Sequence, residues 1–174
     1  MKRSWVLGPV AGVMIVFVLA GNFHRPTIDD DGEKLYMTRC MSCHQVDGNG
    51  ITGVFPPLND VGWVTGDKGR LIRIVLDGVM GEMEVDGITY SGAMPPWKSF
   101  LNDEEVAALL TYVRDAWDNE ASEVTPEEVK LVREATKDRS NMWTAQELMD
   151  EANQGIPGSF GFLVVPKDTT EGHN

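Results

Sequence analysis

Cysteine and histidine are both scarce in this chain of 174 residues, which has two cysteines and three histidines. With so few cysteines, a framework of several disulfides is excluded as the basis of the fold. The histidines do not cluster either, because His24 and His173 lie near the two ends of the chain. A structural zinc site needs four ligands, so these residues favour a different use of the two cysteines.

Basic residues are also few: Lys and Arg number 15 against 27 Asp and Glu, which gives a formal net charge of -12. A surface this acidic repels a phosphate backbone, so we expect no nucleic-acid partner. A basic protein surface is the natural electrostatic match, although such acidity also serves solubility alone. The length allows one globular domain with extensions.

The two cysteines belong to one motif, Cys40-Met41-Ser42-Cys43-His44. It reads C-x-x-C-H, the attachment sequence of a covalently bound c-type haem. The two thiols add across the haem vinyl groups, and the histidine that follows can ligate the iron. The alternatives are a zinc site, a chance match and a thioredoxin-like redox pair, which would need a βαβ setting that this sequence lacks. The motif predicts one covalent haem c.

An uncharged segment, residues 5–20, follows Lys2 and Arg3. Positive charge ahead of an apolar run places the amino end in the cytoplasm and the following chain outside it. The segment is long for a signal-peptide core and slightly short for a membrane span. We expect residues 1–23 to be a membrane anchor or signal segment, joined by a linker over 24–30. The expected location is the inner membrane, with one span and the globular domain in the periplasm, or the periplasm alone if the segment is cleaved.

The first helix of the globular part is predicted from about Asp31 into the haem motif. Gly32 and Tyr36 are four residues apart and share one face of this helix. Glycine weakens a helix, so its presence predicts the close approach of another helix. A later residue, Tyr112, is well placed to meet this face. The alternative is a glycine at a helix start with no packing role.

Two stretches rich in glycine, 45–63 with Pro56-Pro57 and 81–92, are predicted to be loops. A loop that leaves His44 can place a carbonyl on the Nδ1 proton of its ring, which orients the ring and raises its basicity. Pro56 or Pro57 is the candidate acceptor, and a plain surface turn is the alternative. Between the two loops, residues 67–76 have the apolar stripe of a short helix.

Three further helix starts share one signature, a capping residue followed three positions later by Glu and flanked by an apolar pair. The caps are Asn102, Thr125 and Thr144. The first helix continues with apolar residues at core spacing: Val106, Leu109, Leu110, Val113 and Trp117. The other two predict helices over about 126–138 and 145–153. We expect the whole extension, 119–174, to dock on a partner, since its apolar segment 160–165 either does so or folds back on its own domain.

The iron needs a ligand opposite the histidine, and Met94-Pro95-Pro96 is the best candidate segment. The prolines restrict the loop, so the thioether is held at a small entropic cost. Met80 and Met83 are the alternatives, and His24 and His173 are less suitable. A thioether ligand favours Fe(II) and raises the reduction potential relative to two histidines. It also fills the position where a substrate would bind, so we predict an electron carrier with no catalytic residues.

Residues 32–117 resemble a class I c-type cytochrome. The matching features are Gly32 and Tyr36, Cys40-Met41-Ser42-Cys43-His44, Phe55-Pro56-Pro57-Leu58, Tyr90-Ser91-Gly92-Ala93-Met94-Pro95-Pro96-Trp97 and Tyr112-Val113-Arg114. The resemblance implies an all-α cytochrome c domain over 31–118, in which the first and last helices cross beside the haem. It implies thioether attachment at Cys40 and Cys43, axial ligands His44 and Met94, and Pro56 as the carbonyl acceptor. It also implies haem or propionate contacts for Trp63, Tyr90 and Trp97, which core packing explains equally well.

Residues 115–129 resemble cytochrome domains attached to periplasmic dehydrogenases and respiratory complexes, and the architecture resembles the small cytochrome subunit of bacterial alternative complex III. The resemblance implies single-electron transfer on the periplasmic side, within a membrane-anchored, quinol-oxidising respiratory complex. The expected partners are other subunits of that complex, a redox partner such as another cytochrome or an oxidase, and the membrane through residues 5–20. The alternatives are a free periplasmic carrier and a haem enzyme or gas sensor with an open sixth position.

Overall fold

The structure is a computed structural model that describes residues 28–158. Its helices are α1 Ile28–Arg39, α2 Met41–His44, α3 Gly62–Thr65, α4 Lys68–Asp77, α5 Asp103–Asp115, α6 Pro126–Ala135 and α7 Ala145–Met149, with a 3-10 turn at Glu151–Asn153. The strands are β1 Val79–Val85 and β2 Ile88–Met94. The predicted anchor or signal segment and the apolar segment 160–165 lie outside the described residues.

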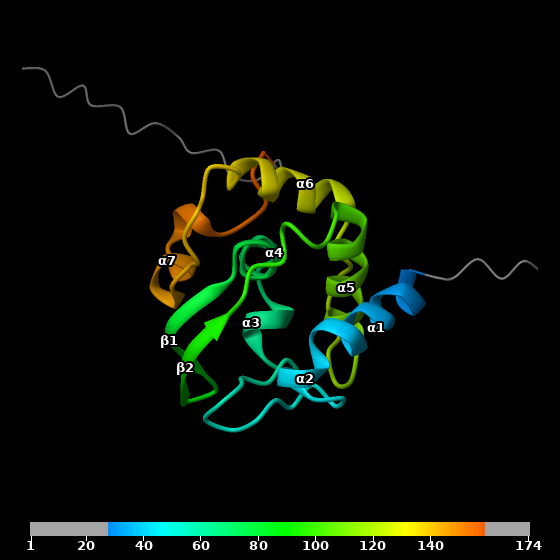
Figure 1. The fold of residues 1–174 in the computed structure, drawn as a ribbon, viewed down its shortest axis with the longest axis vertical. Coiled ribbons are helices and arrows are strands. Elements are labelled where there is room, and N and C mark those ends of the chain that lie inside the picture. The colour runs from blue at the N-terminus through cyan, green and yellow to red at the C-terminus, as the bar shows by residue number, and fades with distance from the viewer. Residues whose placement is uncertain (1–27, 159–174) are drawn as a thin grey trace, which may run out of the picture.

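The crossing of α1 and α5 forms one side of the molecule (Figure 1). The side chain of Tyr36 is fully buried, and its ring centroid lies 5.7 Å from that of Tyr112 on α5. A Cβ at Gly32 would collide with the main-chain oxygen of Ala108 and lie 2.7 Å from the Cβ of Tyr112. The predicted contact between these helices is therefore confirmed, and glycine is what permits it.

The hairpin of β1 and β2 corrects the prediction of an all-α fold. The two strands pair antiparallel from Val79 opposite Met94 to Val85 opposite Ile88, where the sequence analysis predicted a loop over 81–92. The turn is Asp86-Gly87, and both residues have positive φ, 49° and 77°. This is the Asp-Gly signal of a two-residue hairpin turn. The glycines nearby masked it, because Gly81 and Gly92 suggested a loop.

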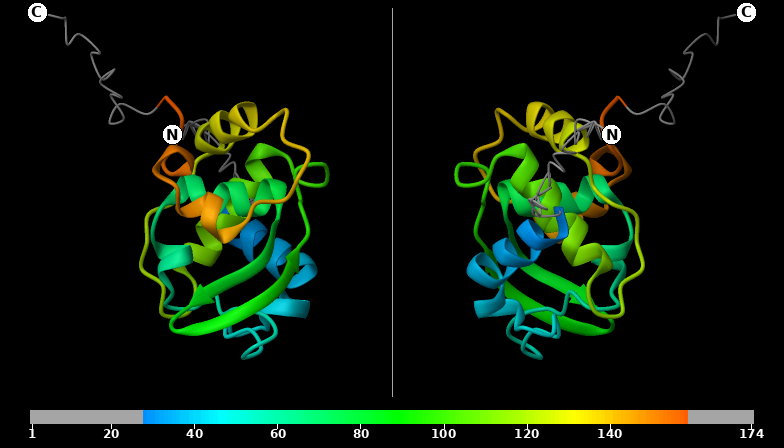
Figure 2. Two further views of the ribbon diagram at one scale, coloured as in Figure 1. Left: turned by 90° about the vertical axis from the view of Figure 1, so that its left-hand side faces the viewer. Right: turned by 90° about the vertical axis from the view of Figure 1, so that its right-hand side faces the viewer.

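The predicted capping boxes are all present, at Asn102, Thr125 and Thr144. The helices that follow the last two are shorter than predicted. α6 ends at Ala135 and α7 at Met149, after which the side chain of Asp150 accepts from the N–H of Ala152 and begins the 3-10 turn. After α5, the chain passes over α4 and α5 and descends beside β1 (Figures 1 and 2).

The prediction of a membrane location is corrected. Within residues 28–158 no helix is long and apolar enough to cross a membrane. The longest described helix, α5, has 13 residues, and at about 1.5 Å per residue it reaches about 20 Å, against about 30 Å for a bilayer core. The segment 5–20, to which the span was assigned, lies outside the described residues.

Candidate haem site

His44 ends the short helix α2 and is buried, with 8% of its surface exposed. Its Nδ1 lies 3.0 Å from the main-chain oxygen of Pro56. This contact fits a ring that donates from Nδ1 and leaves the lone pair of Nε2 for a metal. Burial lowers the pKa of His44, and the hydrogen bond to Pro56 opposes that shift only in part. The ring is therefore kept neutral at pH 7, as ligation of iron requires.

The loop after the motif is folded so that the Pro56 carbonyl reaches the ring. Gly50 donates its N–H to the oxygen of His44 and has a φ of 61°. A Cβ at Gly50 would lie 2.6 Å from the oxygen of Pro56. Both the positive φ and the close approach require glycine here. The sequence indicated Gly50 only as one glycine of a predicted loop.

Cys40 is the N-cap of α2 and Cys43 lies within that helix, and both are free, partly buried thiols. Burial first, and then the neighbouring Cys43, raise the pKa of the Cys40 thiol to about 11. Before a haem is attached, this residue is therefore a protonated thiol at neutral pH. α1 runs directly into α2, and Cys40 donates its N–H to the oxygen of Tyr36. The helix that crosses α5 therefore also fixes the position of the two thiols.

Met94 is the last residue of β2, and its side chain is half-buried against both apolar clusters of the protein. The chain beyond it is fixed by main-chain hydrogen bonds from Trp97 to Val75 (2.9 Å) and from Lys98 to Leu76 (3.0 Å). The predicted proline segment is thus attached to the end of α4. Among the alternative ligands, Met80 is 46% exposed on β1, and Met83 pairs with Tyr90 across the hairpin.

The three predicted aromatic contacts have different surroundings. Trp63 donates its indole N–H to the oxygen of Glu84 (2.9 Å), and the guanidinium of Arg70 lies 4.6 Å from its ring centroid. Tyr90 is buried on β2, with 5% exposed. Trp97 is half-buried beneath the guanidinium of Arg39, 5.8 Å away. The indole N–H of Trp63 thus bonds α3 to β1 of the hairpin. The haem contacts expected of these three residues stay predictions.

Two residues that the sequence patterns did not indicate hold the segment after the haem motif to α5 and the chain that follows it. Asn119, 2% exposed, accepts from the N–H of Asp60 (2.8 Å) and donates to the oxygens of Leu58 (3.0 Å) and Val113 (2.7 Å). Buried Arg114 donates to the oxygen of Val64 (2.6 Å). No local pattern shows these bonds, because their partners are up to 61 positions away.

A model of the cytochrome c family matches residues 30–117, the stretch that contains the motif, the loop and the methionine. The chain belongs to the cytochrome c family. As a member of it, this cytochrome binds haem c covalently, and the two cysteines of a C-x-x-C-H motif are present for the attachment. Within residues 28–158, no group of three or more His, Cys, Asp and Glu side chains could hold a metal ion.

Two kinds of relative are similar to this cytochrome. Cytochrome c-552 of Thermus thermophilus is 35% identical over 144 residues, which cover 79% of this chain and 93% of that protein. The cytochrome c subunit of a quinone alcohol dehydrogenase from Gluconobacter oxydans is 36% identical over 93 residues, 52% of this chain and 19% of the subunit. The match to cytochrome c-552 thus extends well beyond the family domain, whereas the match to the subunit covers a small part of a larger chain.

The donor atoms on the described elements fit a haem c. A short helix and its N-cap present two thiols, a neutral imidazole has Nδ1 engaged and Nε2 available, and a thioether ends a strand that pairs with β1 and is followed by a segment bonded to α4. These are the groups that form thioether bonds and axial ligands to haem iron. Bound haem c supplies reversible one-electron chemistry, while the protein orients the ligands and limits access to the iron.

Proposed function

We propose that this cytochrome transfers single electrons through a haem c attached at Cys40 and Cys43, with His44 and Met94 as the axial ligands. The observation that supports this most directly is the contact from His44 Nδ1 to the Pro56 oxygen at 3.0 Å, which leaves Nε2 as the free nitrogen. Met94 is the best second ligand, since the residues on both sides of it are fixed by main-chain hydrogen bonds.

Two side-chain ligands leave no open coordination position for a substrate. Such a centre exchanges electrons with little rearrangement, which suits a carrier rather than a catalyst. We therefore propose that the protein contributes no catalytic residue, also where it belongs to a larger oxidoreductase.

The partner is proposed to be a larger redox assembly, such as a quinol-oxidising complex, another cytochrome or an oxidase. Supporting this, relatives include the cytochrome c subunit of a quinone alcohol dehydrogenase and a subunit of a cbb3-type cytochrome c oxidase. The docking role of residues 119–174 stays a prediction. Deleting residues 159–174 and comparing which proteins are recovered with the cytochrome under mild isolation tests docking through the end of this extension. Unchanged recovery counts against a docking role for residues 159–174.

A free carrier is the second candidate, and one observation favours it. α6 and α7 pack on α4, α5 and β1 of their own domain, so the described part of the extension already has a binding surface within the chain. Isolation from native cells under gentle conditions distinguishes the two, because a free carrier is recovered alone.

Met94→Ala tests the ligand assignment. We expect the variant to keep its covalent haem, to lose the spectral features of thioether coordination and to have a markedly lower reduction potential, because sulfur no longer stabilises Fe(II). The ferrous variant should bind carbon monoxide readily. Absorption spectra and a redox titration measure these changes.

Met80→Leu and Met83→Leu are the matched controls, because these residues are the alternative thioethers. Both should retain the wild-type spectrum and potential. An unaltered spectrum in Met94→Ala, or loss of the thioether signal in either control, would exclude Met94 as the ligand.

A further inference from the structure

The hairpin that ends at Met94 has a neighbour on its other edge. Val79 of β1 pairs antiparallel with Met94 of β2 and also forms a parallel bridge with Trp143 of the extension. Trp143 donates its N–H to the oxygen of Gly78 (3.0 Å), and its oxygen accepts from the N–H of Met80 (2.8 Å). Residue 143 therefore acts as a one-residue third strand on the side of β1 opposite to β2.

Paired residues on neighbouring strands direct their side chains to the same face of a sheet. Trp143, Val79 and Met94 thus form one row on one face. With strands about 4.8 Å apart, Trp143 lies two strands, or about 10 Å, from Met94. The packing agrees, because Val79 and Met94 both pack against the buried cluster of Ile74, Trp143 and Leu148.

Gly78 makes this close arrangement possible. It ends α4 with a φ of 76°. A Cβ there would lie 2.6 Å from the oxygen of Met94 and 3.0 Å from the Cγ of Met142. The end of α4, the end of β2 and the extension therefore meet at this glycine.

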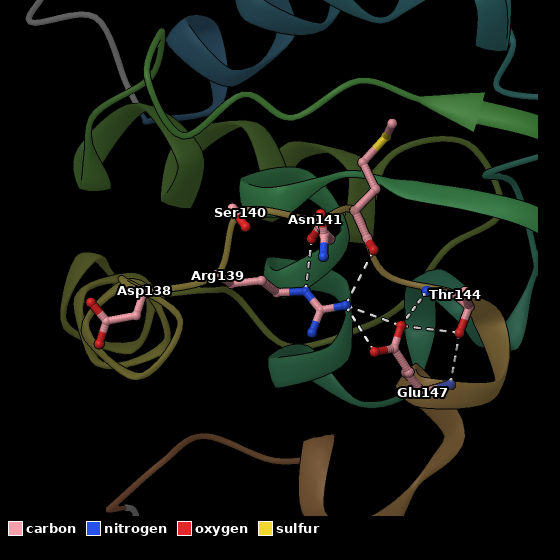
Figure 3. A pocket seen from close by; sticks show the side chains of 7 residues that line it. Asp138, Arg139, Ser140, Asn141, Thr144 and Glu147 are labelled. Carbon is pink, nitrogen blue, oxygen red and sulfur yellow. Dashed lines mark hydrogen bonds and ion pairs between the residues drawn. The ribbon is translucent and has the colours of Figure 1, made fainter.

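The indole of Trp143 is itself held firmly. It is 5% exposed, and the guanidinium of Arg139 lies 3.4 Å from its ring centroid. Arg139 donates to both carboxylate oxygens of Glu147 (3.0 Å each) and to the oxygens of Asn141 (2.9 Å) and Met142 (3.2 Å). Figure 3 shows this guanidinium between the carboxylate and the two carbonyls. We call residues 139–149, which include these groups, the strap.

We propose that Trp143 is a positioning residue for Met94, and that the strap sets how firmly the thioether stays on the iron. Trp143 lies outside the family domain at 30–117. An isolated two-stranded hairpin is only marginally stable in water, so β1 needs support on its second edge to fix β2. This inference rests on the proposed ligation by Met94.

Trp143→Ala in the full-length, haem-loaded protein tests the inference, with the rate of carbon monoxide binding to the ferrous form as the measurement. Carbon monoxide binds only when the methionine leaves the iron, so this rate reports the strength of ligation. Trp143→Phe keeps an aromatic ring in the row and removes an indole N–H that is buried without a hydrogen-bond partner. Unlike Trp143→Ala, it should therefore bind carbon monoxide at the wild-type rate. Val129→Ala is the matched control, since Val129 is fully buried in α6, which packs on α4 and α5.

We expect carbon monoxide to bind Trp143→Ala about tenfold faster than wild type, the change that about 1.4 kcal/mol produces. Trp143→Phe and Val129→Ala should bind at the wild-type rate, although Val129→Ala unfolds more easily. Equal rates in Trp143→Ala and wild type would overturn the inference, and so would an equal acceleration in Val129→Ala.

Two further results keep the test decisive. If Trp143→Ala does not fold, Arg139→Gln is the second variant, because it removes the cation above the indole and leaves the core intact. This variant should also bind carbon monoxide faster than wild type. A wild-type rate in Arg139→Gln would overturn the inference. If wild-type ferrous protein already binds carbon monoxide rapidly, the proposed ligation by Met94 fails, and the inference fails with it. If the wild-type and Trp143→Ala proteins both bind carbon monoxide slowly and at the same rate, the inference about Trp143 fails while the proposed ligation by Met94 stands.

Discussion

Gly32 shows how one residue on α1 affects the whole domain. Glycine is a poor helix former, yet only glycine allows the backbone of α1 to touch Ala108 on α5. The contact brings Tyr36 beside Tyr112 and Trp117, with ring centroids 5.7 Å and 5.1 Å away. Tyr36 in turn donates to the oxygen of Gln45, directly after the haem motif. The position of α1 therefore affects the position of the motif.

Gly32→Ala should lower the free energy of unfolding by about 1 to 3 kcal/mol, the usual cost of overpacking. The added methyl group meets a main-chain oxygen, which cannot rotate away as a side chain could. Denaturant unfolding of the haem-loaded protein measures the change. Gly62→Ala is the matched control, because a Cβ at Gly62 has no atom within 4 Å. A loss of stability as large in the control, or none in Gly32→Ala, would contradict this account.

At the scale of the element, α7 is too short to be stable by itself. It has five residues, and isolated helices of this length do not form in water. It is held by the capping box of Thr144 and Glu147, by buried Leu148 and by the ion pair from Glu147 to Arg139. One carboxylate thus joins the start of the helix to Arg139, at the other end of the strap.

Glu147→Gln should make the protein less stable at pH 7 by up to about 1 kcal/mol, the range for an exposed ion pair. The N–H of Thr144 first, and then Arg139, lower the pKa of Glu147 below its ordinary value of 4.5. A carboxyl with a lowered pKa stabilises the fold at pH values above its ordinary pKa and loses this contribution as the pH falls through its folded value. The difference between variant and wild type should therefore shrink below about pH 4.5.

Urea unfolding at several pH values between 7 and 3 checks this dependence. Glu104→Gln is a suitable control, since Glu104 is exposed in the first turn of α5 and has no ion pair among the described residues. A stability difference for Glu147→Gln that is constant over the whole range would show that the charge of this carboxylate is unimportant.

At the scale of the whole molecule, charge governs encounters with partners. The formal net charge is -12, and the two propionates of a haem c add to it. A protein of one charge sign attracts partners of the other sign over roughly a Debye length, about 8 Å at physiological ionic strength. Electrostatic attraction of this kind raises association rates and weakens with salt.

The rate of electron transfer to a small cationic oxidant should therefore fall as the ionic strength rises from about 0.01 M to about 0.15 M. With an anionic oxidant such as ferricyanide, the rate should rise over the same range, because repulsion is screened. Stopped-flow mixing of the reduced cytochrome with each reagent measures both rates. The same salt dependence for the two reagents would show that the net charge does not steer the encounter.

Patterns close together in the sequence determined the cofactor chemistry and most of the helices. The C-x-x-C-H motif, the three capping boxes and the Gly32–Tyr36 face can be recognised within a few residues, because covalent attachment, capping and helical periodicity act over that distance. The hairpin could have been predicted in the same way from Asp86-Gly87. It was missed because the glycines on both sides of that turn also fit a loop.

Only the tertiary structure decided which distant groups meet. The bonds of Asn119 to the loop and the bridge from Trp143 to Val79 join residues about 60 positions apart, and neither has a sequence signature. The reason is physical: a main-chain N–H or carbonyl is the same at every residue, so the choice of its partner depends on how the whole chain packs. The sequence therefore identified the candidate ligands of the haem, whereas the packed chain determined what supports them.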